Sequence, residues 1–512
     1  MILMIVILIP LAGGFLAWLT GRRNPLLPRI ISLAALALDL LLFVIAILPG
    51  QEYPASENWL MQFQKDWIPF FGISFSLALD GLSLLMLLLT LLLGLLAVIV
   101  SWKEIQHRTG FYYFNLLWAV SGIIGVFLAI DMFLFYFFWE LMIIPMYFLI
   151  SIWGDANRGR AASKFFIYTQ ASGLLMFISI IVLYFLQGQQ TGEYTFDYRE
   201  MLFTSIPPGL SMLLMFGFLA AFFVKLAVVP LHTWQPDAYS SAPTGVTLIL
   251  AGIMLKTGAY GLIRFAVPLF PDAATVFAPV GMLLGVIGIL YGAKLAFAQT
   301  DLKRLIAYTS ISHMGFVLVG VYAFNLIALQ GVVVQMIAHA ISTGALFIMA
   351  GQLQQRLQTR DIGRMGGLWS QAPVMGAMGL IFALASLGLP GMGNFVAEFL
   401  ILTGAFKANV MMTGLACLGL IAATIYSLRI VQKIFLGHEK PDISIKDLNV
   451  KEKLIFGLLV VLILYLGLMP GKIMRIAEPA LTNSMIVQQD IPDGNMDRTD
   501  VKLSNYAFYD RD

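Results

Sequence analysis

The chain has 512 residues, of which 60% are hydrophobic and only 12% are charged. Soluble globular proteins are nearer half apolar and a quarter charged, so this composition excludes a soluble protein and indicates an integral membrane protein. The formal net charge of +3 gives no support for a nucleic-acid partner, and the single cysteine, Cys417, excludes an internal disulfide, a cysteine-based zinc site and an iron–sulfur cluster.

Runs of about 20 apolar residues recur along the whole chain and predict membrane-spanning helices rather than the strands of a β-barrel. The first run, residues 1–20, lacks a charged start and a small-residue cleavage site, so we interpret it as a spanning helix and not as a removable signal. The fold class we predict is an all-α polytopic membrane protein with about fourteen transmembrane helices. The expected spans are 1–20, 28–49, 80–101, 112–130, 132–152, 164–186, 209–233, 243–265, 273–297, 303–322, 326–351, 371–403, 408–435 and 453–471.

Three polar stretches lie between or after the spans. Residues 50–79 include KDWIPFFGISFSLALDG, whose alternation of apolar and polar residues predicts a short hairpin. Residues 187–208 are acidic and polar, and we expect them to form a solvated surface loop. The C-terminal segment DIPDGNMDRTDVKLSNYAFYDRD is expected to be irregular and exposed.

Lysine and arginine residues are dense in every second loop and sparse in the others. The dense loops are expected on the cytoplasmic side of a bacterial inner membrane, which places both termini on the periplasmic side. The dense loops contain Arg22, Arg23, Arg29, Lys103, Arg108, Arg158, Arg160, Lys164, Lys294, Lys303, Arg304, Arg356, Arg360, Arg364, Arg429, Lys433, Lys440, Lys446, Lys451 and Lys453. The opposite loops contain Lys65, Arg199, Arg264 and Lys407.

Two of the expected spans contain a proline near mid-membrane. Pro230 lies in the seventh span, within VVPLH, and Pro390 lies in the twelfth, within GLPGMGN. A proline inside a helix removes a backbone hydrogen bond, and in lipid the freed carbonyl must be satisfied by protein groups or water. A packing kink would explain either proline taken alone.

The spacing of the two breaks favours a second interpretation. They lie five spans apart, so a unit of spans four to eight corresponds to a unit of spans nine to thirteen with inverted topology. Paired broken helices in inverted repeats are typical of a transporter core. The domains we expect are 1–111 with three N-terminal helices, two five-helix repeats at 112–265 and 273–435, and 436–512 with an inner loop, the last span and the tail.

Six titratable side chains within the predicted spans are our main candidates for a functional site. A charged group there costs at least about 2.5 kcal/mol, so such groups indicate a functional site unless a structural role accounts for them. In chain order they are Glu140, Lys225, Lys256, His313, His339 and Glu398. The structural alternatives are an ion pair between Glu140 and Lys225 that only joins helices, and a carboxylate at Glu398 that satisfies the broken backbone. Either histidine is alternatively an ordinary hydrogen-bonding group.

Two further residues, Lys164 and His232, are secondary candidates. They lie nearer the inner interface, where a long side chain commonly reaches towards water and a polar side chain commonly caps a helix end. A structural role therefore explains them at least as well as a role in transport.

The order of these groups along the chain suits proton transfer. Carboxylate, amine, amine, imidazole, imidazole and carboxylate follow one another on successive spans, and protons pass between such groups through water. Burial favours the neutral form of an amine, and a nearby carboxylate favours its charged form. At about 5 Å and an effective dielectric constant near 20, the attraction within such a pair is about 3 kcal/mol. Moving Glu140 towards or away from Lys225 would therefore load or unload a proton.

Metal and nucleotide sites fit the sequence poorly. The histidines lie on separate spans, without the close spacing of zinc ligands, and the glycines form no phosphate-binding motif. We therefore expect no metal and no cofactor in this chain.

Four stretches resemble a known family. KLAVVPLHTWQPDAYSSAPT, LAGIMLKTGAYGLIRF, AFAQTDLKRLIAYTSISHMGF and GLPGMGNFVAEF are similar to motifs of the antiporter-like membrane subunits of respiratory complex I, the proton-translocating NADH:quinone oxidoreductase. The resemblance extends over most of the chain, approximately residues 60–435. Members usually have a lysine in the twelfth span, whereas one branch has a glutamate, and here the residue is Glu398. The chain ends soon after its fourteenth span, without the long lateral helix of L-type members.

The resemblance implies one internal proton path, made of a modulating ion pair, a central lysine, two connecting histidines and a terminal carboxylate towards the outer side. In that order they are Glu140 with Lys225, Lys256, His313 with His339, and Glu398. The resemblance also implies flanking L-type and N-type subunits, with the lateral helix of L running along this chain. NADH, FMN, iron–sulfur clusters and quinone would all be bound by other subunits.

One position departs from the family pattern. Tyr239 follows PDA where many relatives have histidine, and Gln235 replaces a usual apolar residue. A histidine-based inner entrance at this point is therefore not supported, while the central groups are unaffected.

Three functions remain open. The favoured one is a proton-translocating subunit of complex I, driven by quinone reduction elsewhere. A subunit of a multi-subunit cation/proton antiporter or of a membrane-bound hydrogenase shares the same motifs. The third, a membrane scaffold, is disfavoured because joining subunits requires none of the six buried titratable groups.

Overall fold

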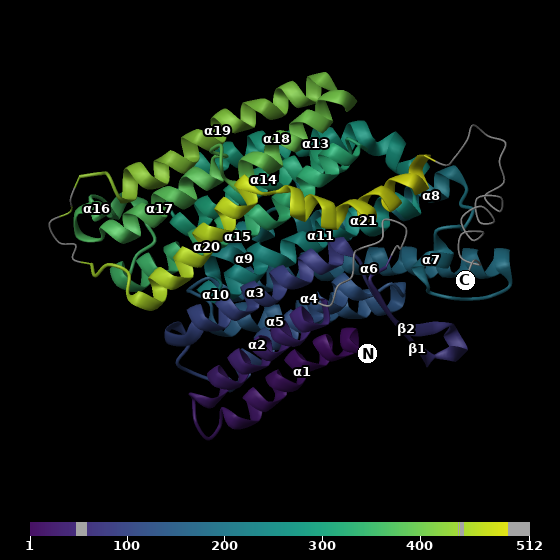
Figure 1. Cartoon of the computed structure of the whole chain (residues 1–512), viewed down its shortest axis with the longest axis horizontal. Coiled ribbons are helices and arrows are strands. Elements are labelled where there is room, and N and C mark those ends of the chain that lie inside the picture. The colour runs from purple at the N-terminus through teal and green to yellow at the C-terminus, as the bar shows by residue number, and fades with distance from the viewer. Residues whose placement is uncertain (48–58, 439, 441–444, 490–512) are drawn as a thin grey trace.

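The computed structural model describes residues 1–47, 59–438, 440 and 445–489, and these residues form a bundle of helices that run side by side (Figure 1). Among the described residues, twelve helical segments are long and apolar enough to cross a membrane. They are α1 Ile2–Thr20, α2 Leu27–Ile47, α3 Gly81–Glu104, α4 Thr109–Leu128, α5 Met132–Trp153, α6 Arg158–Thr191, α8 Pro208–Leu226, the segment Thr244–Leu269, α13 Pro271–Ala298, α14 Leu302–Val321, α15 Leu326–Leu357 and α19 Val410–Ile434.

The two remaining predicted spans also coincide with helices, but each is divided. The twelfth consists of α17, Pro373–Ser386, and α18, Gly393–Ala408. The fourteenth is α20, Val450–Leu468, which is followed after a bend of 69° by α21, Gly471–Gln489. We did not predict α21, because its residues are too polar to read as part of a span. The tail that we predicted to be irregular, residues 490–512, lies outside the described residues.

The segment Thr244–Leu269 is not a uniform α-helix, because two π-helical turns interrupt it. Its parts are α10 Thr244–Ile249, the π-turn η2 Leu250–Met254, α11 Leu255–Gly261, the π-turn η3 Leu262–Ala266 and α12 Val267–Leu269. Such turns are rare in proteins as a whole, but those that occur are often found at functional sites. The apolar stretches of this segment and of α15 are buried throughout, so these two elements form the centre of the bundle.

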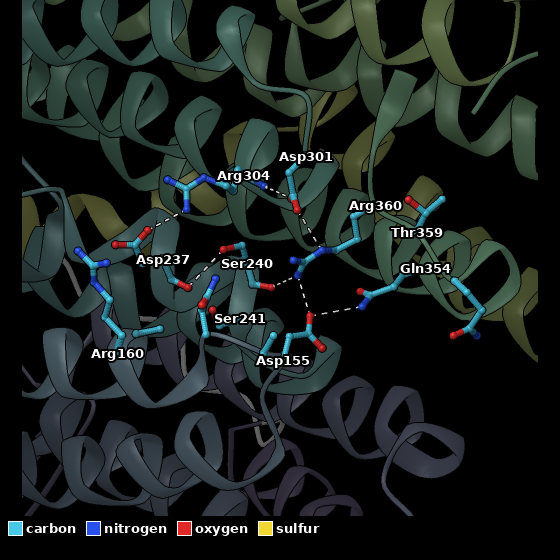
Figure 2. Close-up of a pocket in the computed structure, with 14 residues that line it drawn as sticks. Asp155, Arg160, Asp237, Ser240, Ser241, Asp301, Arg304, Gln354, Thr359 and Arg360 are labelled. Atoms are coloured by element: carbon cyan, nitrogen blue, oxygen red, sulfur yellow. Dashed lines mark hydrogen bonds and ion pairs between the residues drawn. The ribbon is translucent and has the colours of Figure 1, made fainter. Parts of the chain in front are cut away.

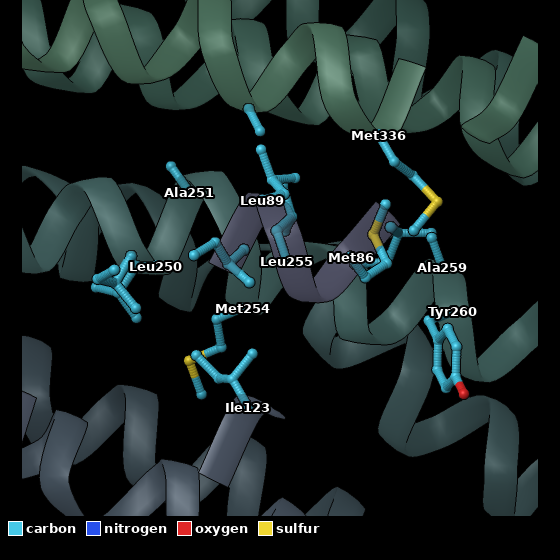
Figure 3. Close-up of a cluster of buried hydrophobic side chains, with 14 of the residues drawn as sticks. Met86, Leu89, Ile123, Leu250, Ala251, Met254, Leu255, Ala259, Tyr260 and Met336 are labelled. Atoms are coloured by element: carbon cyan, nitrogen blue, oxygen red, sulfur yellow. The ribbon is translucent and has the colours of Figure 1, made fainter. Parts of the chain in front are cut away.

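Apolar side chains from neighbouring helices surround the middle of the segment Thr244–Leu269. In Figure 3, Met86 and Leu89 of α3 and Met336 of α15 lie around Leu255 and Ala259 of α11. Polar groups buried in such a setting depend on protein partners for their hydrogen bonds. The hydrogen-bond partners of the titratable side chains therefore show which of these side chains are in direct contact.

The predicted hairpin is confirmed. Strand β1, Met61–Ile68, pairs antiparallel with β2, Ile73–Leu79, and the 3₁₀ turn η1, Pro69–Phe71, joins them. Gly72 has a φ of 65°, a conformation that favours glycine. Figure 1 shows the hairpin at the same end of the bundle as the start of α1.

Short helices occupy the connections. The segment that we predicted to be a loop, residues 187–208, contains the last turn of α6 and the short helix α7 instead. The remaining short elements are α7 Tyr198–Met201, α9 Trp234–Ser241, the 3₁₀ turn η4 Ile362–Arg364 and α16 Leu368–Gln371.

Aspartate and asparagine side chains begin several helices by accepting hydrogen bonds from the backbone of the first turn. Asp80 begins α3 and Asp131 begins α5 in this way, with N···O distances of 2.8 and 2.9 Å. Asn449 and Glu452 form a reciprocal capping box at the start of α20. These caps explain why the helices start where the apolar runs begin.

The backbone leaves helical geometry beside both mid-span prolines. α8 ends at Leu226, Ala227 has a φ of 57°, and α9 begins at Trp234. The indole N–H of Trp234 donates to the carbonyl of Val224 at 2.9 Å and so satisfies a group freed at the end of α8. The first interruption is therefore stabilised by protein groups.

The second interruption depends on glycine. α17 ends at Ser386 and α18 begins at Gly393. Between them, Gly388 and Gly391 have φ angles of 79° and 93°, which other residues rarely adopt. The correspondence of the two interrupted regions as inverted repeats stays a prediction.

Three basic residues that we assigned to loops, Arg29, Arg264 and Lys303, are buried in helical segments instead. Arg264 of η3 forms an ion pair with Asp80 and lies over the ring of Trp59, 5.1 Å from its centroid. Lys303 of α14 donates to the carbonyl of Ala242 at 3.1 Å. Our assignment was wrong because hydropathy reports the average polarity of a segment and not the partners of a single side chain.

Small residues bring α13 and α14 into close contact. A Cβ atom at Gly315 would lie 2.5 Å from the carbonyl oxygen of Gly285. Close approach of backbones at small residues is a common basis of helix packing in membranes. This contact orients α14, which carries His313.

Candidate functional site

Lys256 and His339 meet at the centre of the bundle. The Nζ of Lys256, on α11, lies 2.7 Å from Nδ1 of His339, on α15. The same Nζ donates to the carbonyl oxygen of Ala251 at 2.7 Å. Both side chains are 0% exposed, so the amine and the imidazole are in contact within the buried interior.

The path continues from His339 to a second histidine and a carboxylate. The rings of His339 and His313 are perpendicular to within about 20°, with centroids 5.6 Å apart. Nδ1 of His313, on α14, lies 3.0 Å from Oε1 of Glu398, on α18. The structure thus places four of the six predicted groups in one series, in the order Lys256, His339, His313, Glu398.

Three polar residues that we did not predict complete the surroundings of His313. Its Nε2 lies 3.2 Å from the hydroxyl of Ser386 and 3.5 Å from that of Tyr426. The amide of Gln335 lies 3.4 Å from Nδ1 of His313 and 3.5 Å from Oε1 of Glu398. The sequence could have indicated Gln335, because it precedes His339 by four residues and therefore lies on the same face of the helix.

Glu398 lies against the second interruption. An ideal Cβ at Gly388 would be 3.1 Å from its Oε2. That Oε2 is buried and has no hydrogen-bond partner among the described residues. The Oε1 atom of this carboxylate therefore contacts His313. The Oε2 atom lies beside the interruption and is free to accept or release a proton.

The structure holds Lys225 and Glu140 apart. Nζ of Lys225 is buried and forms neither a hydrogen bond nor an ion pair with any described residue. It lies over the rings of Trp139 and Phe165, 5.1 and 5.8 Å from their centroids. Glu140 is only partly buried and interacts with the side chains of Gln170 and Tyr136. The predicted ion pair is therefore not formed in this conformation.

Lys164 makes contacts that fit the structural role that we considered as an alternative. Its Nζ donates to the carbonyl of Thr233 at 2.6 Å and to Asp237 at 2.8 Å, so it caps the backbone beside the first interruption. His232 packs its ring on Tyr291, with centroids 5.4 Å apart. Neither side chain contacts the series that contains Lys256.

A polar cavity of about 710 Å³ lies between α6, α9, α14 and the end of α15 (Figure 2). Its charged lining residues are Asp155, Arg160, Asp237, Asp301, Arg304 and Arg360. The guanidinium of Arg360 forms ion pairs with Asp155 at 2.7 Å and Asp301 at 3.0 Å, and so joins the loop before α6 to the start of α14. No sequence signal predicted this cluster, because its members are far apart in the chain.

Asp237 is the second centre of this cluster. Its carboxylate forms ion pairs with Lys164 and Arg304, both at 2.8 Å. Burial raises the pKa of Asp237, but the hydrogen bonds and charges of the two cations outweigh burial and hold the pKa below its ordinary value. The carboxylate is therefore ionised at neutral pH, and it anchors α9 between α6 and α14.

Within the residues that the structure describes, no three His, Cys, Asp or Glu side chains are grouped so as to hold a metal ion. The chemistry that the arrangement offers is proton transfer between an amine, two imidazoles and a carboxylate.

Known sequences and structures resemble this chain along most of its length. A sequence model of the family described as NADH:quinone oxidoreductase/Mrp antiporter, TM, matches residues 129–425. The chain is 53% identical to NADH-quinone oxidoreductase subunit M of Pseudomonas aeruginosa, over 94% of this chain and 97% of that protein. It is 52% identical to subunit M of Escherichia coli K12, with the same two shares.

Two solved structures share its fold. A chain of respiratory complex I from Thermus thermophilus matches with a TM-score of 0.85 and 31% identity, over 95% of this chain and 100% of that chain. A chain of the Mrp complex from a Dietzia species matches with a TM-score of 0.79 and 22% identity, over 99% of this chain and 55% of that one. The second likeness concerns the fold alone.

Proposed function

The chain belongs to the NADH:quinone oxidoreductase/Mrp antiporter family, and within it to the M-type subunits, so we propose that its buried side chains carry protons through the membrane arm of NADH:quinone oxidoreductase, respiratory complex I. One observation carries the proposal. Lys256, His339, His313 and Glu398 form a series of titratable groups at the centre of the bundle. A scaffold would gain nothing from such a series, because each buried titratable group costs free energy.

The series transfers a proton in three steps. The charged amine of Lys256 donates to Nδ1 of His339, and the resulting imidazolium releases its proton from Nε2 towards His313. The two rings lie edge to face with centroids 5.6 Å apart, so His313 is the next titratable group after His339. His313 then passes a proton from Nδ1 to Oε1 of Glu398, and Glu398 releases it beside the interruption at Gly388.

Glu140 and Lys225 control how readily the series is loaded. When the carboxylate approaches the ammonium, their attraction of about 3 kcal/mol at 5 Å favours a proton on Lys225. When the pair is apart, as here, the faces of Trp139 and Phe165 lie nearest the charge, and Glu140 attracts it only from a distance. The energy for closing the pair would come from quinone reduction in the rest of the complex.

The remaining assignments are proposals of the same kind. The chain is a subunit of an oxidoreductase that itself holds no redox group, with NADH, FMN, iron–sulfur clusters and quinone bound by partner subunits. L-type and N-type subunits flank it, and the partly exposed Glu140 lies on a surface of α5 that such a neighbour can cover. Both termini lie on the periplasmic side of a bacterial inner membrane, and the cavity at Arg360 faces the cytoplasm.

The main alternative is a subunit of a cation/proton antiporter or of a membrane-bound hydrogenase. The fold does not separate the alternatives, since the Mrp chain shares it. The identity of more than half to M-type subunits favours complex I.

Purification of the chain with a C-terminal tag, from membranes of its own host, decides between these alternatives. We expect L-type and N-type subunits to co-purify with it, together with an activity that reduces quinone with NADH. Co-purification with sodium-transport subunits instead, without NADH oxidation, would overturn the assignment to complex I.

A further inference from the structure

The π-turn η2 supplies the backbone acceptor of the central lysine. The N–H of Leu255 bonds to the carbonyl of Leu250, five residues earlier, as the π geometry requires. The next carbonyl, of Ala251, accepts from Nζ of Lys256 at 2.7 Å. The position of Lys256 relative to His339 therefore depends on the shape of this turn.

A side chain from another helix holds the turn in place. The hydroxyl of Tyr239, on α9, donates to the carbonyl of Leu250 at 3.0 Å. The Leu250 oxygen thus accepts two hydrogen bonds, one from Leu255 and one from Tyr239, and so uses both of its lone pairs. In chain order, the carbonyl that Tyr239 holds comes directly before the carbonyl that Lys256 uses.

The surroundings leave Tyr239 little freedom. It is 0% exposed, and its ring packs against Trp234 and against Phe347 of α15, with centroids 6.2 and 5.8 Å away. The hydroxyl of Thr247, on α10, donates to the carbonyl of Tyr239 at 3.0 Å. Tyr239 of α9 is thus bonded both to Thr247 of α10 and to Leu250, the first residue of the turn.

The opposite face of α9 belongs to the inner cavity. Asp237, Ser240 and Ser241 line that cavity (Figure 2), and Asp237 is fixed by Lys164 and Arg304. The helix that carries the ionic cluster therefore also carries the hydroxyl that holds the π-turn.

We propose that Tyr239 is a positioning residue for Lys256, whose hydroxyl holds the η2 turn so that the Ala251 carbonyl orients the amine towards His339. The inference rests on the proposed function, because it assigns a role within the same proton path. Tyr239 does not transfer the proton itself, and its contribution is the hydrogen bond to Leu250.

The variant Tyr239→Phe tests this role in the assembled complex, in sealed inverted membrane vesicles. We expect the rate of NADH-driven proton translocation per assembled complex to fall about fivefold, which corresponds to the roughly 1 kcal/mol of one net hydrogen bond. The variant Tyr239→His keeps an N–H donor and loses the phenol ring, and we expect it to recover most of the rate.

Tyr322→Phe is the matched control. Tyr322 is also buried, but its hydroxyl has no hydrogen-bond partner among the described residues, so its removal should leave the rate unchanged. If Tyr239→Phe translocates protons at the rate of the unmodified complex, the positioning role is wrong. It is equally wrong if Tyr239→His is as slow as Tyr239→Phe, because the ring and not the donor then matters.

Two further comparisons give a clear outcome even if Tyr239→Phe fails to assemble. If Tyr239→Phe does not assemble, Tyr239→His alone decides: near-normal translocation supports the role, and a large loss or failure to assemble overturns it. The variant Lys256→Ala separates the inference from the proposed function. Normal translocation by Lys256→Ala refutes the proton path itself, whereas a slow Lys256→Ala beside a normal Tyr239→Phe refutes only the inference.

Discussion

Lys225 is a buried ammonium whose described neighbours are aromatic rings rather than acceptors. Trp139 and Phe165 face its charge at 5.1 and 5.8 Å from their centroids. Cation–π attraction of this kind contributes about 0.5–2 kcal/mol, less than a closed ion pair at the same depth. The charge on Lys225 is therefore weakly held, and a carboxylate that moves has a large effect on it.

Removing either member of this pair should slow proton translocation strongly. We expect Lys225→Ala and Glu140→Ala each to reduce NADH-driven proton uptake into inverted vesicles about tenfold or more, since proton transfer by a positioned group commonly contributes a hundredfold or more. Lys225→Arg should be impaired as well, because a guanidinium does not release its proton in the physiological range. A normal proton-to-electron ratio in a fully assembled Lys225→Ala complex would show that the pair does not control the path.

Asp39 of α2 is a buried carboxylate that contacts none of the four groups of the series among the described residues. It is 0% exposed, and neither of its oxygens has a hydrogen-bond partner among the described residues. An unsatisfied buried polar group costs about 1–3 kcal/mol. We expect Asp39→Leu to raise the midpoint of thermal unfolding of the purified complex without loss of proton translocation.

Asp131 provides the matched control for Asp39. It is also buried, but its carboxylate accepts hydrogen bonds from the backbone amides of Ser74, Phe133 and Leu134. Asp131→Leu should therefore lower the unfolding midpoint. A lower midpoint for both variants would contradict the view that Asp39 is an unsatisfied group.

Some individual residues of the site could be predicted from the sequence. Lys256, His339, His313 and Glu398 are conspicuous because a charged or imidazole side chain within an apolar run is costly. Ser386 and Tyr426 were missed because hydroxyl groups are ordinary in membrane helices. The separation of Glu140 from Lys225 could not be predicted, since it depends on which way two side chains point from helices distant in sequence.

At the scale of elements, glycines decide how closely helices approach. Gly315 of α14 packs on α13 with no room for a side chain, because a Cβ atom would lie 2.5 Å from the Gly285 oxygen. Gly414 of α19 has no described atom within 4 Å of its own ideal Cβ. We therefore expect substitution by alanine to have opposite effects on stability at these two glycines.

Gly315→Ala should destabilise the protein by about 1–3 kcal/mol, since crowding in a packed interior costs that much. Gly414→Ala should be neutral or stabilise by up to about 1 kcal/mol, the difference in helix propensity. The unfolding midpoint and the amount of assembled complex in membranes are the measurements. Equal effects of the two substitutions would mean that the contact between α13 and α14 is not tight.

Element positions could be predicted better than element shapes. Hydropathy located twelve of the fourteen predicted spans as single helical segments long enough to cross a membrane, because lipid imposes one length and one polarity on such helices. The other two predicted spans coincide with divided helices among the described residues. The π-turns η2 and η3 and the helix α21 were not predicted. A π-turn changes the hydrogen-bond spacing without changing the apolar pattern, and α21 is too polar to resemble a span.

For the molecule as a whole, function depends on what the bundle encloses. The segment Thr244–Leu269 and α15 form its buried centre, and they contribute Lys256 and His339 to one contact. Apolar side chains of the surrounding elements, among them Met86, Leu89 and Met336, pack around this central segment (Figure 3). Protons would therefore cross the centre through the side chains of the series.

Proton uptake by inverted vesicles that contain the His339→Leu complex tests this account most directly. His339 is the link between Lys256 and His313, and the exposed His107 offers His107→Leu as the matched control. We expect the His339→Leu complex to assemble and to lose NADH-driven proton translocation about tenfold or more, and the His107→Leu complex to keep it. Normal translocation by an assembled His339→Leu complex would contradict this account.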